Sequence, residues 1–111
     1  PESKIDALTA LTGSGPAFFF ALIESMIDAG IKMGFTPQEA RKLVLPMLQG
    51  SLTLLEKSGM DPADLKEKIT SPKGTTMAGL KKMEESAISL GLTNTFLAAY
   101  NRAKELSTLV P

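Results

Sequence analysis

The chain of 111 residues contains no cysteine and no histidine, and these two absences exclude several kinds of functional site. Without cysteine there is no disulfide, no thiolate metal site and no cysteine nucleophile. Without histidine there is neither a Ser-His-Asp triad nor one of the usual zinc sites. The lack of cysteine fits a cytoplasmic protein, and that is the location we expect.

An excess of charge of either sign is also absent, because 12 basic residues balance 12 acidic residues. Nucleic-acid-binding domains usually carry a strong basic patch, so we expect no nucleic acid as a partner. Long apolar runs are scarce as well: the longest, from Pro16 to Ile23, ends at Glu24. No signal-peptide pattern is seen, and we expect no membrane-spanning segment.

What the sequence does contain is helical periodicity, which places apolar residues three and four positions apart. No segment alternates with the period of a strand. The length suits one domain with a core, so residues 1–111 are predicted to form a single all-α domain of five to six helices with short glycine- and proline-rich connections. The predicted helices are 4–12, 16–33, 37–58, 63–69, 75–89 and a last one from about 94 to 108.

Several residues predict where these helices begin and end. Thr36, with Glu39 three positions later, forms the pattern of a capping box. Gly34 and Gly59 are predicted to end the second and third helices, and Gly91 the fifth. Gly30 lies inside the second helix, where glycine weakens a helix, so we expect a close backbone approach at this position.

The second predicted helix is apolar on almost every side. Its polar positions Glu24, Asp28 and Lys32 form one narrow stripe at four-residue spacing. A helix of this kind is buried at the centre of a domain or by a second subunit, and it predicts a homodimer. Glu24 and Asp28 also raise a metal site as an alternative, but two carboxylates without histidine favour a solvated face, and no metal site is predicted.

One stretch, Ser71-Pro72-Lys73-Gly74-Thr75-Thr76, combines a proline, a glycine, a lysine and three hydroxyl groups between two predicted helices. Pro72 disfavours the helical conformation at Ser71. The first turn of the helix that begins at Thr75 leaves backbone N–H groups unpaired. Such a helix start can bind a small anion such as a carboxylate or phosphate, and the alternative is an ordinary corner between two helices.

A second corner, Leu11-Thr12-Gly13-Ser14-Gly15-Pro16-Ala17, joins the first two predicted helices. The two corners in this order, together with Asp28-Ala29-Gly30-Ile31-Lys32-Met33-Gly34 between them, resemble the C-terminal half of pyrroline-5-carboxylate reductase. The resemblance covers essentially the whole chain. It implies a helical domain that interleaves with a second copy as a dimer, often assembled further.

The resemblance also implies an activity and a site. The family passes a hydride from NADPH or NADH to the C=N bond of 1-pyrroline-5-carboxylate and so makes L-proline. Its Ser-Pro-Gly-Gly-(Ala/Thr)-Thr loop binds the substrate carboxylate, and Ser71, Gly74, Thr75 and Thr76 fall on that loop. Thr76 falls on the threonine near the ring nitrogen, as the candidate catalytic residue. Lys73 departs from the family, which usually has glycine there, and leaves the loop geometry open.

The cofactor is expected to bind elsewhere. The family holds it in an N-terminal Rossmann domain, and no G-x-G-x-x-G motif follows a strand in this sequence, so no cofactor-binding residue is predicted. We expect a piece of a longer enzyme that is inactive alone. Two alternatives stay open at this point: a purely structural dimerisation module, and the helical domain of a related dehydrogenase that acts on another small acid.

Overall fold

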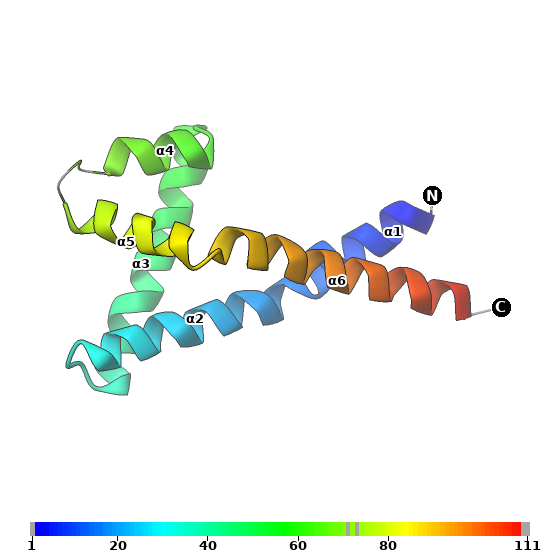
Figure 1. Cartoon of the computed structure of the whole chain (residues 1–111), viewed down its shortest axis with the longest axis horizontal. Helices are drawn as coiled ribbons and strands as arrows, with labels where there is room; N and C mark the ends of the chain where they lie inside the picture. Colours follow the sequence, from blue (N-terminus) through cyan, green and yellow to red (C-terminus); the bar gives the residue numbers. More distant parts are fainter. Residues whose placement is uncertain (1, 71, 73, 110–111) are drawn as a thin grey trace. The chain divides into compact units, whose positions relative to one another are not determined.

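A computed structural model describes residues 2–70, 72 and 74–109 of the chain, with the side chains of residues 2 and 3 excepted. The elements are α1 (Glu2–Leu8), the π-helical turn η1 (Thr9–Gly13), α2 (Gly15–Lys32), α3 (Pro37–Ser58), α4 (Pro62–Ile69), α5 (Thr75–Glu85) and α6 (Ile88–Leu109). Figure 1 shows their order along the chain. No strand occurs in these described ranges, which confirms the predicted all-α class.

The contacts divide the chain into two compact units, Pro1–Leu22 with Lys82–Pro111, and Ile23–Lys81. Helices α2 and α5 each have residues in both units. Each unit is described by itself below. The single domain over residues 1–111 stays a prediction.

In the first unit, α6 packs against α1 and η1. Asp6 and Ala10 are buried in this contact, at 7% and 3% exposure. The hydroxyl of Ser107 on α6 donates a hydrogen bond of 2.5 Å to Oδ1 of Asp6. This bond ties the end of α6 to α1 and gives the buried carboxylate a donor.

The first helical stretch differs from its prediction in one turn. Residues 4–12 were expected to form one regular helix, but the turn Thr9–Gly13 is π-helical. The N–H of Ser14 donates to the carbonyl of Thr9 over 2.9 Å, a bond that spans five residues. Such a turn accommodates one extra residue, and apolar periodicity does not reveal it.

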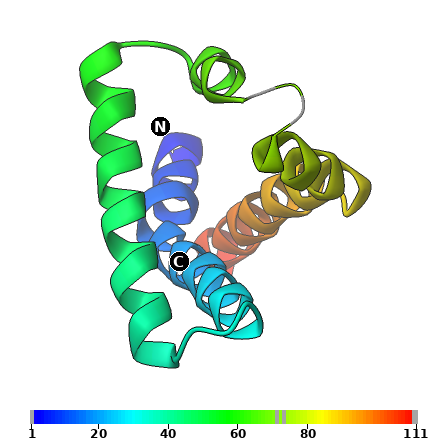
Figure 2. The same ribbon diagram turned by 90° about the vertical axis from the view of Figure 1, so that its left-hand side faces the viewer.

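In the second unit, α3 follows α2 after a short turn, and α4 follows α3 (Figure 2). Thr36 caps α3 as predicted: its Oγ1 accepts from the N–H of Glu39 over 3.1 Å, and its own N–H donates to Glu39 Oε1 over 2.8 Å. Gly34 and Gly59 have φ values of 109° and 66° after α2 and α3. These values are readily adopted by glycine, so both predicted helix ends are confirmed.

The structure corrects the predicted boundary between α5 and α6. Gly91 was expected to end the fifth helix near Ser89, but α5 ends at Glu85 and α6 begins at Ile88. The break lies at Ala87, which has a φ of 54°. Gly91 lies inside α6, where its N–H donates to the carbonyl of Ala87.

The buried core of the described residues is very small. Asp6, Ala10 and Ala40 are buried in the part of the chain whose side chains are described, and no large side chain there is fully buried. The apolar helix α2 contains no buried residue, and Phe20 on it is 61% exposed. The prediction that a second subunit covers this helix is therefore consistent with its exposure.

One helical run satisfies a length criterion that the sequence reading did not anticipate. Lys4–Lys32 is 29 residues long and, by length and composition only, sufficient to cross a membrane. A helix that packs inside a protein passes the same criterion. The absence of a membrane partner therefore stays a prediction.

Candidate functional site

The candidate site is the segment from the end of α4 to the first turn of α5, in the second unit. Thr70 follows α4 in an extended conformation, with φ −93° and ψ 117°. Its N–H donates to the carbonyl of Glu67 over 3.1 Å, and its Oγ1 donates to the carbonyl of Lys66 over 2.6 Å. The hydroxyl and the backbone of Thr70 together hold the last turn of α4 and direct the chain into the loop.

Thr75 and Thr76 are the first two residues of α5, as the sequence predicted. The carbonyl of Gly74 accepts from the N–H of Ala78 over 3.4 Å, so Gly74 stands at the cap of the helix. The N–H groups of Thr75, Thr76 and Met77 belong to the first turn, which has no acceptor within the helix. No acidic residue lies in this turn to compete for them. These donors and the positive end of the helix dipole suit a carboxylate.

Both threonine side chains are exposed, and Gly74 is half-buried. In the described part of the chain, neither hydroxyl is held by another protein group. A hydroxyl that is not already engaged is free to hydrogen-bond a ligand. The structure therefore brings Gly74, Thr75 and Thr76 together in one helix start. Ser71 and Lys73 lie outside the described residues, so the predicted role of Ser71 and the effect of Lys73 stay predictions.

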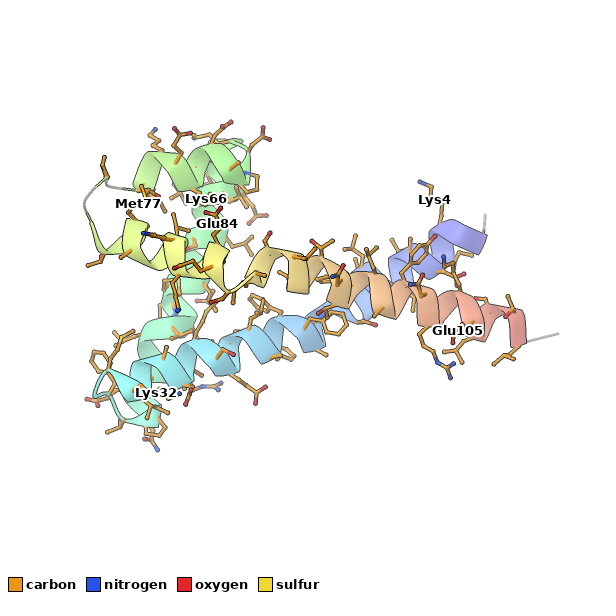
Figure 3. All side chains as sticks on the ribbon, in the orientation of Figure 1. Lys4, Lys32, Lys66, Met77, Glu84 and Glu105 are labelled. Carbon is orange, nitrogen blue, oxygen red and sulfur yellow. The ribbon has the colours of Figure 1, made fainter. Side chains whose placement is uncertain are left out.

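An open groove of about 640 Å³ lies beside this loop, between α4 and α5. Lys66 of α4 and Met77 of α5 both line it and project from the facing sides of the two helices (Figure 3). The remaining lining residues are Ala63, Glu67, Thr70, Pro72 and Leu80. The groove is mostly apolar with one cation, one carboxylate and one hydroxyl, which suits a small ligand that is partly apolar and partly charged.

Lys66 was not singled out from the sequence. It lies in the last turn of α4, four residues before Thr70, and both residues line the groove. The basic residues Lys66 and Lys68 occupy the last turn of α4 and add positive charge at the entrance to the loop. The position of Lys66 in the last helical turn before the loop was the signal from which its place near the site could have been predicted.

The second glycine-rich corner lies in the first unit and has a packing role. The ring of Phe96 on α6 approaches Gly15, where an added Cβ would meet it at 3.5 Å. The same ring stands edge-on to Phe18, with the ring centroids 5.0 Å apart and the planes at 88°. The start of α2 is thereby fixed against α6.

The carboxylates of α2 behave as a solvated face. Oδ2 of Asp28 forms an ion pair of 3.0 Å with Nζ of Lys32, and both side chains are more than half exposed. Such a pair contributes at most about 1 kcal/mol to stability. Asp28 is thus engaged with a neighbouring cation on the helix surface.

Comparison with known proteins gives one consistent result. The family described as pyrroline-5-carboxylate reductase dimerisation matches residues 2–106. The pyrroline-5-carboxylate reductase of Kluyveromyces lactis is 42% identical over 106 residues, which cover 96% of this chain and 37% of that protein. The enzyme of Arabidopsis thaliana is 40% identical over 106 residues, with 96% and 38% covered.

A solved structure agrees in fold. The crystal structure of Plasmodium falciparum pyrroline carboxylate reductase with NADP bound superposes with a TM-score of 0.91 at 36% identity, covering 95% of this chain and 40% of that one. The chain thus spans about two fifths of the length of the relatives it matches. From the family match over residues 2–106 and these identities, the chain belongs to the pyrroline-5-carboxylate reductase dimerisation family.

Proposed function

We propose that this chain is the substrate-binding and dimerisation domain of a pyrroline-5-carboxylate reductase, an enzyme that reduces 1-pyrroline-5-carboxylate to L-proline with NAD(P)H. The observation that carries the proposal is the start of α5, where Gly74, Thr75 and Thr76 present unpaired backbone donors and free hydroxyls in a chain of this family.

The substrate is a small ring with one carboxylate. The N–H groups of the first turn of α5 bind the carboxylate, with Ser71, Gly74, Thr75 and Thr76 as the contacting residues. The ring lies toward the apolar part of the groove, which Met77 and Leu80 line. Charge at the helix start and an apolar wall beside it together orient a molecule that has both features.

Thr76 is the proposed catalytic residue. Reduction of the C=N bond adds a hydride to carbon and leaves a proton to be supplied to nitrogen. The chain has no histidine to act as the acid. The hydroxyl of Thr76 hydrogen-bonds the ring nitrogen and orients it, or relays the proton from water.

The nicotinamide cofactor does not fit this chain. Dinucleotide sites of the Rossmann type need a strand, a glycine-rich turn and a helix, and the described ranges contain no strand. In the proposed enzyme, NADPH or NADH is held by the N-terminal Rossmann domain that the family resemblance implies, and we expect that the chain alone does not turn over. Measurable proline-dependent reduction of NADP⁺ by the 111-residue chain would contradict this.

The proposed partners are the substrate 1-pyrroline-5-carboxylate, the product L-proline and a second copy of the chain, as a homodimer or a higher homo-oligomer. The apolar surface of α2 supports the homodimer. The balance of 12 basic and 12 acidic residues supports a protein without a nucleic-acid partner. A cytoplasmic enzyme with no membrane partner completes the proposal.

A chimera tests the activity. The 106-residue region of the Kluyveromyces lactis enzyme that matches this chain is replaced by the chain itself. We expect the chimera to oxidise NADPH when 1-pyrroline-5-carboxylate is added. The parent enzyme is the positive control, and a chimera whose α5 start carries Gly74→Pro is the matched loop control. A correctly assembled dimer without activity, while the parent is active, contradicts the proposal and favours a purely structural module.

The same chimera tests the other alternative, that the chain is the helical domain of a related dehydrogenase acting on another small acid. Other small cyclic or linear imino and keto acids are offered at equal concentration. Preference for 1-pyrroline-5-carboxylate supports the proposal, and preference for another acid assigns the domain to a related dehydrogenase.

A further inference from the structure

Lys66 is the one positive charge among the described residues that line the groove between α4 and α5. It is exposed, and it projects from the side of α4 that faces Met77 (Figure 3). In the described part of the chain, neither ion pair involves Lys66, and its ammonium group donates no hydrogen bond. Glu67, which follows it and lines the same groove, is likewise outside those ion pairs. The charge of Lys66 is therefore available to a ligand.

Thr70 fixes the backbone of Lys66 beside the loop. The hydroxyl of Thr70 donates to the carbonyl of Lys66 over 2.6 Å, and its N–H donates to the carbonyl of Glu67 over 3.1 Å. Thr70 is the C-cap of α4 and immediately precedes Ser71. Because both bonds act where the chain leaves α4, they anchor Lys66 next to the entry of the loop. Met77, in the first turn of α5, lines the same groove, so the groove also borders the helix start.

A cation in the last turn of a helix also has an ordinary structural role, which Lys66 shares with Lys68. Both lie in the last turn of α4, where a positive charge interacts favourably with the negative end of the helix dipole. They differ at the groove, which Lys66 lines and Lys68, also a described residue, does not. Comparing the two lysines therefore separates stabilisation of the helix end, which both provide, from a role in the groove.

We propose that Lys66 is a further substrate-binding residue of the reductase, whose ammonium group pairs with the carboxylate of 1-pyrroline-5-carboxylate beside the first turn of α5. This inference rests on the proposed function and deepens it, because the residues assigned above to the carboxylate belong to the loop and the start of α5 alone. Lys66 adds a mobile charge from the facing helix, so the carboxylate is held from both sides of the groove.

The chemistry of the carboxylate suits two kinds of donor at once. Its two oxygens offer about four acceptor sites, so the N–H groups of a helix start leave room for a further donor. An ammonium group is a compact charge with three donors on a flexible stem, and it reaches such a site without the fixed geometry of a guanidinium group.

The contact with Lys66 has a defined kinetic consequence. Substrate, transition state and product all carry the carboxylate, so the ammonium group binds all three alike. Uniform binding of this kind lowers KM and leaves kcat nearly unchanged. It also favours charged acids over neutral analogues of the same shape. A purely structural lysine has neither effect.

The experiment measures KM and kcat of the Kluyveromyces lactis chimera for 1-pyrroline-5-carboxylate, with Lys66→Met and the matched control Lys68→Met. We expect Lys66→Met to raise KM by about 3- to 10-fold, the range for an exposed or partly desolvated charge pair, with kcat changed by less than about twofold. Lys68→Met is expected to leave both near the wild type, and Lys66→Arg, which keeps the charge, to restore most of the affinity. Equal KM values for Lys66→Met and Lys68→Met overturn the proposal.

Salt gives a second readout that loss of helix stability would not move. Raising the ionic strength from about 0.1 M to about 1 M shortens the screening length from roughly 10 Å to roughly 3 Å. We expect KM of the wild-type chimera to rise more steeply with salt than KM of Lys66→Met. Identical salt dependence of the two proteins overturns the proposal.

A pair of ligands identifies the group that Lys66 contacts. The product L-proline carries the carboxylate, and L-prolinamide replaces it by a neutral amide. Their dissociation constants for the chimera are measured by titration calorimetry, which does not require turnover. We expect Lys66→Met to weaken L-proline by about 3- to 10-fold and L-prolinamide by less than about twofold. Equal weakening of both ligands overturns the proposal.

The failures of the two proposals are distinguishable. A chimera that neither turns over nor binds L-proline contradicts the proposed function, and this inference with it. A chimera that reduces 1-pyrroline-5-carboxylate or binds L-proline, and whose Lys66→Met variant behaves as Lys68→Met does, supports the proposed function and overturns only the role of Lys66.

Discussion

Gly30 on α2 and Ala40 on α3 meet so closely that a Cβ on Gly30 would lie 2.9 Å from the Cβ of Ala40. Ala40 is 1% exposed, the lowest value among the residues of the second unit whose burial the structure describes. A methyl group on a helix backbone has no freedom to move aside. The glycine that weakens α2 locally is therefore what allows α3 to pack against it.

The first prediction concerns this contact. Gly30→Ala is expected to destabilise the protein, because overpacking costs about 1–3 kcal/mol and the gain in helix propensity offsets at most about 1 kcal/mol. Urea unfolding at one fixed chain concentration measures the change in the free energy of unfolding. Gly50→Ala in α3 is the matched control, since an added Cβ there meets nothing within 4 Å and the change is expected to stabilise or be neutral. Equal effects of the two substitutions would contradict the close packing.

The second prediction concerns the edge-on pair of Phe18 and Phe96. Replacing each ring by leucine, singly and together, forms a double-mutant cycle. The coupling free energy is expected to be about 0.5–1.5 kcal/mol, because edge-to-face pairs are worth this much beyond the area they bury. A cycle on Phe19 and Phe96 serves as the control, with no coupling expected. Strictly additive losses at Phe18 and Phe96 would show that the rings do not interact.

The third prediction tests the capping box of α3. Thr36→Ala removes the hydroxyl that accepts from Glu39 N–H, and it is expected to cost about 1 kcal/mol of unfolding free energy. Thr36→Ser keeps the acceptor and is expected to retain most of the stability. The ranking of the wild type, the serine variant and the alanine variant in thermal unfolding is the measurement, and an alanine variant as stable as the serine variant would refute it.

The fourth prediction concerns the buried carboxylate of Asp6. Ser107→Ala removes its hydrogen-bond donor and is expected to destabilise by about 1–3 kcal/mol, the usual consequence of leaving a buried polar group unsatisfied. Thr108→Ala removes only a bond to the carbonyl of Glu105 on the exposed side of α6 and is expected to have less effect. A larger loss for Thr108→Ala than for Ser107→Ala would contradict the role of the Asp6–Ser107 bond.

Much of the fold could be predicted from residues whose side chain or backbone conformation favours one local structure, such as a helix start or a helix end. The Thr36–Glu39 pair stands before an apolar run and so predicts the capped helix start that the structure shows, and Gly34 and Gly59 end helices because other residues rarely adopt their φ values. Gly30 was also interpretable, because a glycine inside an amphipathic helix needs a packing reason, and Ala40 supplies it.

Other features could not be predicted because residue type does not determine them. Ala87 adopts a left-handed conformation that alanine rarely occupies, while Gly91, the expected break, remains helical. In α6 the hydroxyl of Thr95 donates to the carbonyl of Gly91 over 2.8 Å. The π-helical turn at Thr9–Gly13 escaped prediction for a similar reason, since one inserted residue leaves the apolar pattern nearly unchanged.

The candidate site was predicted in part. Gly74, Thr75 and Thr76 stand at the start of α5 as expected, because proline and glycine before two threonines favour a helix start. Lys66 was missed, since its presence at the groove depends on how α4 packs beside α5. Single helices are read from local pattern, whereas a groove between helices depends on tertiary packing.

The central claim is that the start of α5 binds and orients the substrate through Thr76, and kcat/KM of Thr76→Val in the chimeric enzyme tests it most directly. Valine keeps the shape of threonine without its hydroxyl, Thr76→Ser keeps the hydroxyl, and Thr95→Val on α6 is the control outside the site. We predict that Thr76→Val lowers kcat/KM by about 10²-fold or more, the usual contribution of a positioned acid–base group, while the serine and Thr95 variants stay near the wild type with the dimer intact. A Thr76→Val dimer with unchanged kcat/KM would contradict the account.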